Sequence, residues 1–129
     1  MNIDHIAIWV DDLERMREFY VTYFQMVSNE KYMNPKKGFT SYFLTFGESK
    51  TRLELMNRAD ITEEPSNRGF HKGIAHLAVS VGDKKAVDLL TERLRADGYE
   101  IVGEPRTTGD GYYESVVLDP EGNNIEITS

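Results

Sequence analysis

The sequence contains no cysteine, and this absence limits both how the chain can be stabilised and what it can bind. No disulfide can form, and any bound metal must take its ligands from histidine and carboxylate side chains. The sequence also has no apolar run approaching the roughly 20 residues of a membrane-spanning helix. Its first residues include Asp4, Asp11 and Asp12 rather than a basic segment, so we expect no signal peptide and a cytoplasmic protein.

Basic residues are the minority among the charged ones. Lysine and arginine number 15 against 22 aspartates and glutamates, which gives a formal net charge of −7. This charge argues against nucleic acid and against an anionic membrane surface as partners, while a small molecule stays open. With 129 residues, 40% of them hydrophobic, the sequence predicts one globular domain over residues 1–129.

The chain does contain a repeat, and each copy carries a histidine and a glutamate. His5 lies in the run IDHIAIWV and His76 in the run IAHLAVSV, 71 residues later. Glu54 lies in RLELM and Glu126 in NIEIT, 72 residues later. A fixed-period repeat of this kind indicates two similar structural modules.

Hydrophobic periodicity predicts the same order of elements, strand-helix-strand-strand-strand, in both halves. We expect a single α+β domain with modules at about 1–57 and 73–129 and a polar linker at about 58–72. In the first module the predicted strands are 3–10, 27–32, 39–46 and 52–56, with a helix from residue 13 to about residue 24. In the second they are 73–81, 99–103, 113–118 and 123–128, with a helix between Asp83 and Gly98 and a loop at 105–111.

One histidine or glutamate in a strand is more often structural than a ligand. Here, however, both glutamates are flanked by apolar residues, so alternation sends each glutamate to the face opposite the core. Two His–Glu pairs at equivalent places therefore predict a site for a divalent transition metal formed by His5, Glu54, His76 and Glu126.

The same residues carry a family resemblance. The run HIAI followed by Phe19-Tyr20, then RLEL, GIAHLA and LDPEGNNIEI, resembles the vicinal oxygen chelate superfamily, the glyoxalase, bleomycin-resistance and dioxygenase group. The resemblance covers nearly the whole chain and implies two βαβββ modules that form an open curved sheet or barrel around a metal site. A His-Glu-His-Glu set is similar to that of glyoxalase I, the lactoylglutathione lyase. It implies one divalent ion, with Ni or Co favoured and Zn, Mn or Fe open.

The reaction that this resemblance implies is the isomerisation of a hemithioacetal, formed from a thiol and a 2-oxoaldehyde such as methylglyoxal, to a 2-hydroxyacyl thioester through an enediolate. Glu126 would be the principal base, and Glu54 the second carboxylate ligand and a possible partner in proton transfer. Glutathione-dependent members have an arginine where this chain has Trp9 and an asparagine where it has Arg58. Arg58 could still bind a substrate carboxylate, and the identity of the thiol stays open.

Two other kinds of function compete with this one. The first is a bleomycin-resistance-like protein that binds a drug or metabolite without chemistry. The second is another enzyme of the superfamily, either an epimerase, which typically has glutamine in place of Glu54, or an extradiol dioxygenase, which has a single glutamate ligand. An aromatic face on the first helix predicts a homodimer.

Overall fold

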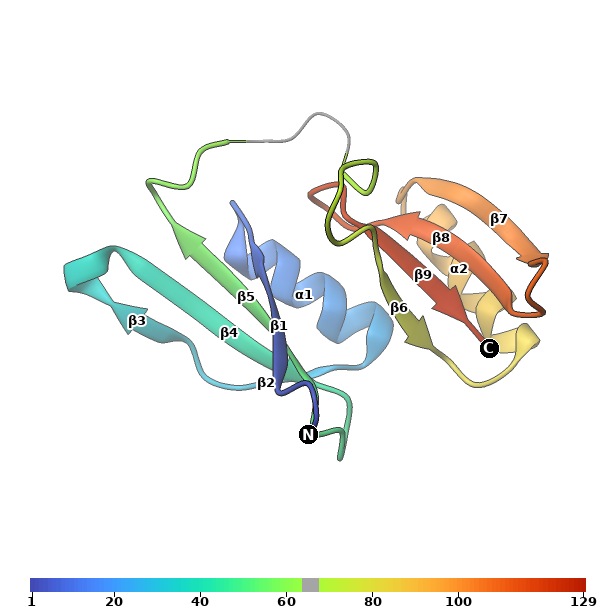
Figure 1. Cartoon of the computed structure of the whole chain (residues 1–129), viewed down its shortest axis with the longest axis horizontal. Coiled ribbons are helices and arrows are strands. Elements are labelled where there is room, and N and C mark those ends of the chain that lie inside the picture. Colours follow the sequence, from blue (N-terminus) through green and yellow to red (C-terminus); the bar gives the residue numbers. More distant parts are fainter. Residues whose placement is uncertain (64–67) are drawn as a thin grey trace. The chain divides into compact units, whose positions relative to one another are not determined.

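The chain folds into two α+β units, Met1–Glu64 and Pro65–Ser129, each with one sheet and one long helix (Figure 1). The computed structural model describes residues 1–63 and 68–129. The middle of the predicted linker, residues 64–67, lies outside the described residues. The α+β class and the open sheets agree with the prediction.

The first unit has a five-stranded sheet in the order β1-β5-β4-β2, with β3 also paired to β4. Strand β1 runs parallel to β5, and the other neighbours are antiparallel. The first and last strands of the unit are therefore adjacent. Its elements are β1 (His5–Trp9), α1 (Leu13–Phe24), β2 (Val27–Ser28), β3 (Tyr32–Asn34), a 3-10 turn (Pro35–Lys37), β4 (Phe39–Thr45) and β5 (Arg52–Arg58).

The second unit has a four-stranded sheet in the order β6-β9-β8-β7, again with its first and last strands parallel and adjacent. Its elements are β6 (Leu77–Ser80), α2 (Lys84–Ala96), β7 (Ile101–Thr107), β8 (Tyr113–Leu118) and β9 (Asn124–Thr128). The element order predicted from the sequence is thus present in both halves, apart from one additional short strand, β3, in the first. The main strand order of the two sheets follows one pattern of pairing.

Several predicted boundaries differ from the structure. The single strand expected at 27–32 is two short strands, β2 and β3. Strand β5 continues past residue 56 because Asn57 and Arg58 still pair with β4, so Arg58 belongs to a strand and not to the linker. Strand β7 continues into the predicted loop, and Pro105 is tolerated because β7 is an edge strand with irregular register.

Each helix covers one face of its sheet and leaves the other face to the candidate ligands. In the first unit Leu53 and Leu55 of β5 are buried with α1, and in the second Ile125 and Ile127 of β9 are buried with α2. Because strand side chains alternate, the glutamates between these residues point to the face opposite the helix, as the sequence predicted.

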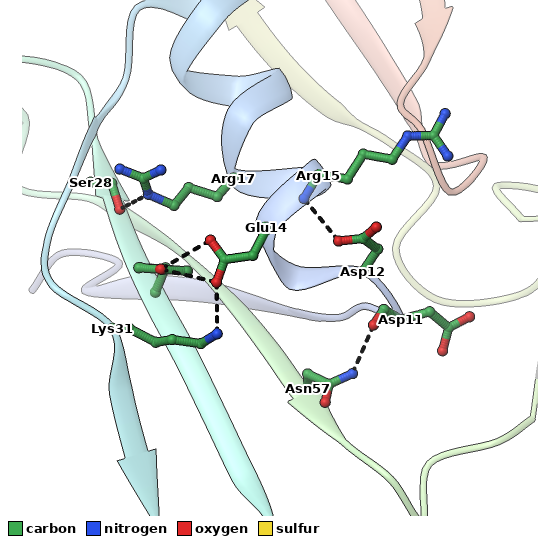
Figure 2. Close-up of polar contacts among 9 residues, drawn as sticks. Asp11, Asp12, Glu14, Arg15, Arg17, Ser28, Lys31 and Asn57 are labelled. Atoms are coloured by element: carbon green, nitrogen blue, oxygen red, sulfur yellow. Dashed lines mark hydrogen bonds and ion pairs between the residues drawn. The ribbon is translucent and has the colours of Figure 1, made fainter.

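Side-chain caps fix where the two helices begin. The Asp12 carboxylate accepts a hydrogen bond from the Arg15 backbone N–H at 3.0 Å, as Figure 2 shows, and Asp83 does the same for Ala86 at 2.8 Å. Such caps satisfy backbone donors that have no partner within the helix. They place α1 and α2 at equivalent points after the first strand of each unit.

A polar cluster around Glu14 ties α1 to the sheet of the first unit (Figure 2). Glu14 accepts hydrogen bonds from the Lys31 ammonium at 2.6 Å and from the Tyr42 hydroxyl at 3.1 and 3.2 Å. The hydrogen bond from Lys31, more than any other contact, holds the pKa of Glu14 below its usual 4.5. The cluster therefore stabilises the fold while Glu14 is ionised.

Replacing Glu14 by glutamine tests this cluster. Because the folded-state pKa is lowered, the stabilisation is present above the ordinary pKa of 4.5 and is lost as the pH falls through the folded value. The Glu14 and Lys31 side chains are 56% and 35% exposed, so we expect a loss of only about 0.5–1 kcal/mol at pH 7. Urea unfolding at pH 7 and pH 3 measures it. An equal difference at both pH values would contradict the assignment.

Candidate metal centre

In the first unit, one histidine and one glutamate meet across adjacent parallel strands. His5 pairs with Arg52 in the β1–β5 register, and Ala7 pairs with Glu54. His5 and Glu54 therefore lie on the same face, offset diagonally by two residues. Their side chains approach to 3.7 Å between His5 Nε2 and Glu54 Oε2. We call these residues the first His–Glu pair.

The second unit repeats this geometry. Ala78 pairs with Glu126 in the β6–β9 register, and His76 lies two residues before Ala78. The diagonal offset is the same as in the first unit, and His76 Nε2 lies 3.1 Å from Glu126 Oε2. These residues form the second His–Glu pair. His76 was predicted to lie inside a strand, but it immediately precedes β6.

The donor atoms of the second pair are spaced for one ion, and those of the first pair lie slightly further apart. Metal–ligand bonds of roughly 2.1 Å place neighbouring ligand atoms about 3.0–3.4 Å apart. The observed separations of 3.1 and 3.7 Å are close to this range, and imidazole with carboxylate suits a divalent transition metal. Among residues 1–63 and 68–129 no three His, Cys, Asp or Glu side chains form a group that could hold a metal. Each pair therefore supplies two ligands and requires further ligands from outside its own group.

Three residues around His5 and its neighbour Asp4 have defined contacts. The His5 Nδ1 atom lies 2.8 Å from the Asp4 carboxylate, which also accepts a hydrogen bond from Arg52 at 2.5 Å. The hydrogen bonds from His5 and then Arg52 hold the pKa of Asp4 below its usual value. The Phe43 ring lies edge-on to the His5 ring, with centroids 5.4 Å apart. One nitrogen of the His5 ring and one neighbouring aromatic ring therefore define its surroundings on this side.

A second carboxyl group, not predicted from the sequence, interacts with Glu126. Glu114 of β8 lies on the face of Glu126, two residues from Val116, its register partner. Burial is the main cause that raises the pKa of Glu114, followed by the negative charge of Glu126, while Arg106 at 3.8 Å acts in the opposite direction. The sequence signal that could have found Glu114 is strand alternation. Alternation places Glu114 on the same face as Val116, which pairs with Glu126.

The segment that leads to His76 is held against the start of β9. The Asn124 side chain donates a hydrogen bond to the Arg68 carbonyl at 3.1 Å. Gly69, at φ +85°, lies so close that a Cβ atom would be 2.2 Å from Asn124 Nδ2 and 2.8 Å from the Ala75 carbonyl oxygen. A residue with a side chain at position 69 would therefore displace the chain next to His76.

The variant Gly69→Ala tests this close approach. Its matched control is Gly98→Ala, because Gly98 has a similar φ of +89° but nothing within 4 Å of its Cβ position. Both variants carry the strain of a positive φ, and only Gly69→Ala adds a clash. We expect Gly69→Ala to lower the free energy of unfolding by at least about 1 kcal/mol more than Gly98→Ala. Chemical denaturation measures both, and equal losses would show that the segment can move freely.

Defined neighbours also surround Trp9, Asn57 and Arg58. The Arg58 guanidinium lies over the Trp9 ring at 5.4 Å and pairs with Asp60 at 2.5 Å. Asn57 donates its amide to the backbone carbonyls of Val10 and Asp11 at 2.8 and 3.1 Å, and the contact with Asp11 is drawn in Figure 2. Asn57 is thus used to hold β5 to the chain after β1. Arg58 lies on the same face of β5 as Glu54 and is therefore still a candidate for substrate binding.

The fold and the two pairs define a class of protein: a duplicated α+β chain in which a histidine at or just before the first strand of each half lies next to a glutamate of the last strand, which runs parallel to it. The chain belongs to the Glyoxalase/Bleomycin resistance protein/Dioxygenase superfamily, which it matches over residues 2–127. No helix among the described residues is long and apolar enough to span a membrane.

Individual relatives agree with this assignment. The chain is 27% identical over 128 residues to the uncharacterized protein YqjT of Bacillus subtilis, covering 97% of this chain and 96% of YqjT. The trypanothione-dependent glyoxalase I of Leishmania major is similar in structure, with a TM-score of 0.79, 27% identity, and coverage of 100% of this chain and 86% of that chain. Glyoxalase I from Zea mays is also similar, with a TM-score of 0.79 and 26% identity. The match with the maize protein covers 98% of this chain but only 43% of the maize chain.

Proposed function

We propose that this protein is a metal-dependent, glyoxalase I-like lyase that isomerises a hemithioacetal to a 2-hydroxyacyl thioester. The observation that carries the proposal is the pair of register-matched His–Glu pairs, in which both units present the same donor atoms with the same diagonal offset. Similarity to two glyoxalase I structures supports the same chemistry.

In this proposal His5, Glu54, His76 and Glu126 together hold one divalent ion, with nickel or cobalt favoured and zinc, manganese or iron as alternatives. When bound, the ion would polarise the substrate's oxygen atoms as a Lewis acid. Each pair supplies two ligands, so a four-ligand site needs both pairs, either from one chain or from two copies in a homodimer. The histidines would bind through neutral imidazole nitrogens.

We assign Glu126 as the principal base. Glu126 would remove the proton from the carbon bonded to sulfur and return it to the adjacent carbon. The hydroxyl proton would pass from the oxygen of the first carbon to the oxygen of the second, so that protons balance over the reaction. The assignment is supported by Glu114, a part-buried second carboxyl group against Glu126, because paired carboxyls in different environments are typical of acid–base sites. Glu54, whose side chain is 12% exposed, would serve chiefly as a ligand.

Arg58 beside Trp9 is the proposed contact for a carboxylate on the substrate. Asp60 already pairs with Arg58, so the substrate would have to share or displace this partner. A low-molecular-weight thiol other than glutathione fits the presence of Trp9 and Arg58. Methylglyoxal removal in the cytoplasm is the corresponding proposed role.

The direct experiment measures metal content and turnover. Protein loaded with Ni²⁺, Co²⁺ or Zn²⁺ is expected to bind one ion for every four-ligand set and to isomerise adducts of methylglyoxal with a panel of thiols. Binding of ions without turnover would favour a ligand-binding protein, and turnover that depends on O₂ would favour a dioxygenase. A chain that binds no divalent ion would overturn the proposal.

Mixing two inactive variants separates the two possible arrangements of the site. His5→Ala and His76→Ala each remove one ligand from a different unit. If sites are shared between two copies, a mixed dimer regains one complete site and part of the activity. If each site is built within one chain, the mixture stays inactive.

A further inference from the structure

We infer that Asp4 is a positioning residue that orients the His5 ring for metal binding, supported by Arg52 and Phe43. The inference rests on the proposed function for the identity of the bound group. The contacts that carry it, however, belong to the chain itself and can be tested without any ion.

The contact between Asp4 and His5 defines the role of each ring nitrogen. The Asp4 carboxylate can only accept a hydrogen bond, so His5 Nδ1, at 2.8 Å from it, carries the hydrogen. The other nitrogen, Nε2, is then left with its lone pair and lies on the side of Glu54, 3.7 Å from Oε2. A ligating histidine needs this arrangement, since the bond made by one nitrogen sets which nitrogen can bind the metal.

Asp4 is itself held in place, although it lies outside β1 and its side chain is 70% exposed. Its backbone carbonyl accepts a hydrogen bond from the Arg52 N–H at 3.0 Å. The Arg52 guanidinium also donates a hydrogen bond to the Asp4 carboxylate and lies over the Phe43 ring at 4.2 Å. Arg52 is therefore fixed at both its backbone and its side chain.

The two residues that support Asp4 come from the neighbouring strands β5 and β4. Arg52 is the β5 partner of His5, and Phe43 is the β4 partner of Glu54. Phe43 contacts both the guanidinium of Arg52 and the His5 ring. The orientation of the His5 ring therefore depends on side chains of two neighbouring strands as well as on the exposed Asp4 carboxylate.

The second unit lacks the same side chains at the corresponding positions. Ala75 precedes His76 where Asp4 precedes His5, Asn124 stands where Arg52 stands, and Val116 is the partner of Glu126 where Phe43 is the partner of Glu54. None of these residues can supply a carboxylate, a guanidinium or an aromatic ring. Asp4 therefore distinguishes the first His–Glu pair from the second, and His76 becomes an internal reference for any change at His5.

The test compares Asp4→Ala and Asp4→Asn with the wild type. Glu48→Ala serves as the charge control, because Glu48 is an exposed acidic residue in the turn before β5. In the metal-free chain, ¹⁵N-resolved NMR of the three histidines at about pH 8.5, above the usual imidazole range, is expected to show His5 with its hydrogen on Nδ1. Asp4→Ala should shift His5 toward the Nε2–H form and leave His76 unchanged. Asp4→Asn, whose carbonyl oxygen can still accept from Nδ1, should keep part of the wild-type form.

Metal affinity supplies the second measurement. Competition between the protein and a chelator for Ni²⁺ is expected to give a 10–100-fold weaker affinity for Asp4→Ala, an intermediate loss for Asp4→Asn and no loss for Glu48→Ala. A wild-type His5 with its hydrogen on Nε2 would overturn the inference, as would an Asp4→Ala affinity within twofold of the wild type. A wild type that binds no ion refutes the proposed function instead, and the NMR comparison still decides the role of Asp4.

Discussion

Replacing Glu126 by glutamine is expected to lower kcat by about two to four orders of magnitude. Glutamine keeps the size of the side chain and one carbonyl oxygen, but it cannot take up a proton. The apolar neighbours that orient position 126, Ile125 and Ile127, are unchanged and fully buried, so the fold should be retained. Steady-state kinetics on metal-loaded protein, with the metal content of each sample measured, tests this expectation.

The matched comparison is Glu54→Gln, which makes the same change at the equivalent position of the first unit. If Glu54 acts mainly as a ligand, its variant should lose metal affinity and regain part of its activity at saturating metal. Glu126→Gln should stay inactive under the same conditions. The opposite ranking would move the role of base to Glu54, and full activity in both variants would refute a carboxylate base at either position.

Ile125→Ala is expected to lower the free energy of unfolding by about 2–5 kcal/mol. Ile125 is 0% exposed and lies on β9 between its register partners Leu77 and Val117. Removing its outer carbons would leave a cavity between the central strands and α2 that the surrounding sheet can fill only in part. Urea denaturation followed by circular dichroism measures the change.

Val102→Ala is the control for this substitution, because Val102 lies on edge strand β7 and is 49% exposed. Its expected loss is below about 1 kcal/mol. Comparable losses for the two variants would contradict the placement of Ile125 in the core of the second unit. Because Ile125 adjoins Glu126, its variant should also weaken metal binding at temperatures where the fold is still retained.

The sequence predicted those parts of the fold that depend on local patterns. Apolar residues on both sides of Glu54 and Glu126 correctly placed both glutamates opposite the helices, since alternation is a property of the strand itself. The predicted end of β7 was wrong because proline usually interrupts strands, whereas Pro105 is tolerated on an edge strand. The predicted end of β5 was wrong because Asn57 and Arg58, which follow the apolar run, are kept in the strand by pairing with β4.

The candidate site was predicted as a set of four residues, while its supporting residues were not. The role of Glu114 depends on its cross-strand neighbour Glu126. The role of Asp4 depends on its contacts with Arg52 and His5. Those neighbours lie at least 12 residues away in the sequence, except for His5 itself, so no local pattern identifies them. The joining of the two His–Glu pairs in one site stays a prediction.

The pairing of first and last strands has a consequence for stability in a chain without cysteine. His5 and Glu54 are 49 residues apart, and His76 and Glu126 are 50 apart, so each pair joins the beginning of a unit to its end. An ion held by both pairs, as proposed, would close a loop of roughly 50 residues in each unit and restrict the unfolded chain much as a disulfide would. Metal loading would then act as a reversible cross-link in each unit, and chelation would loosen both.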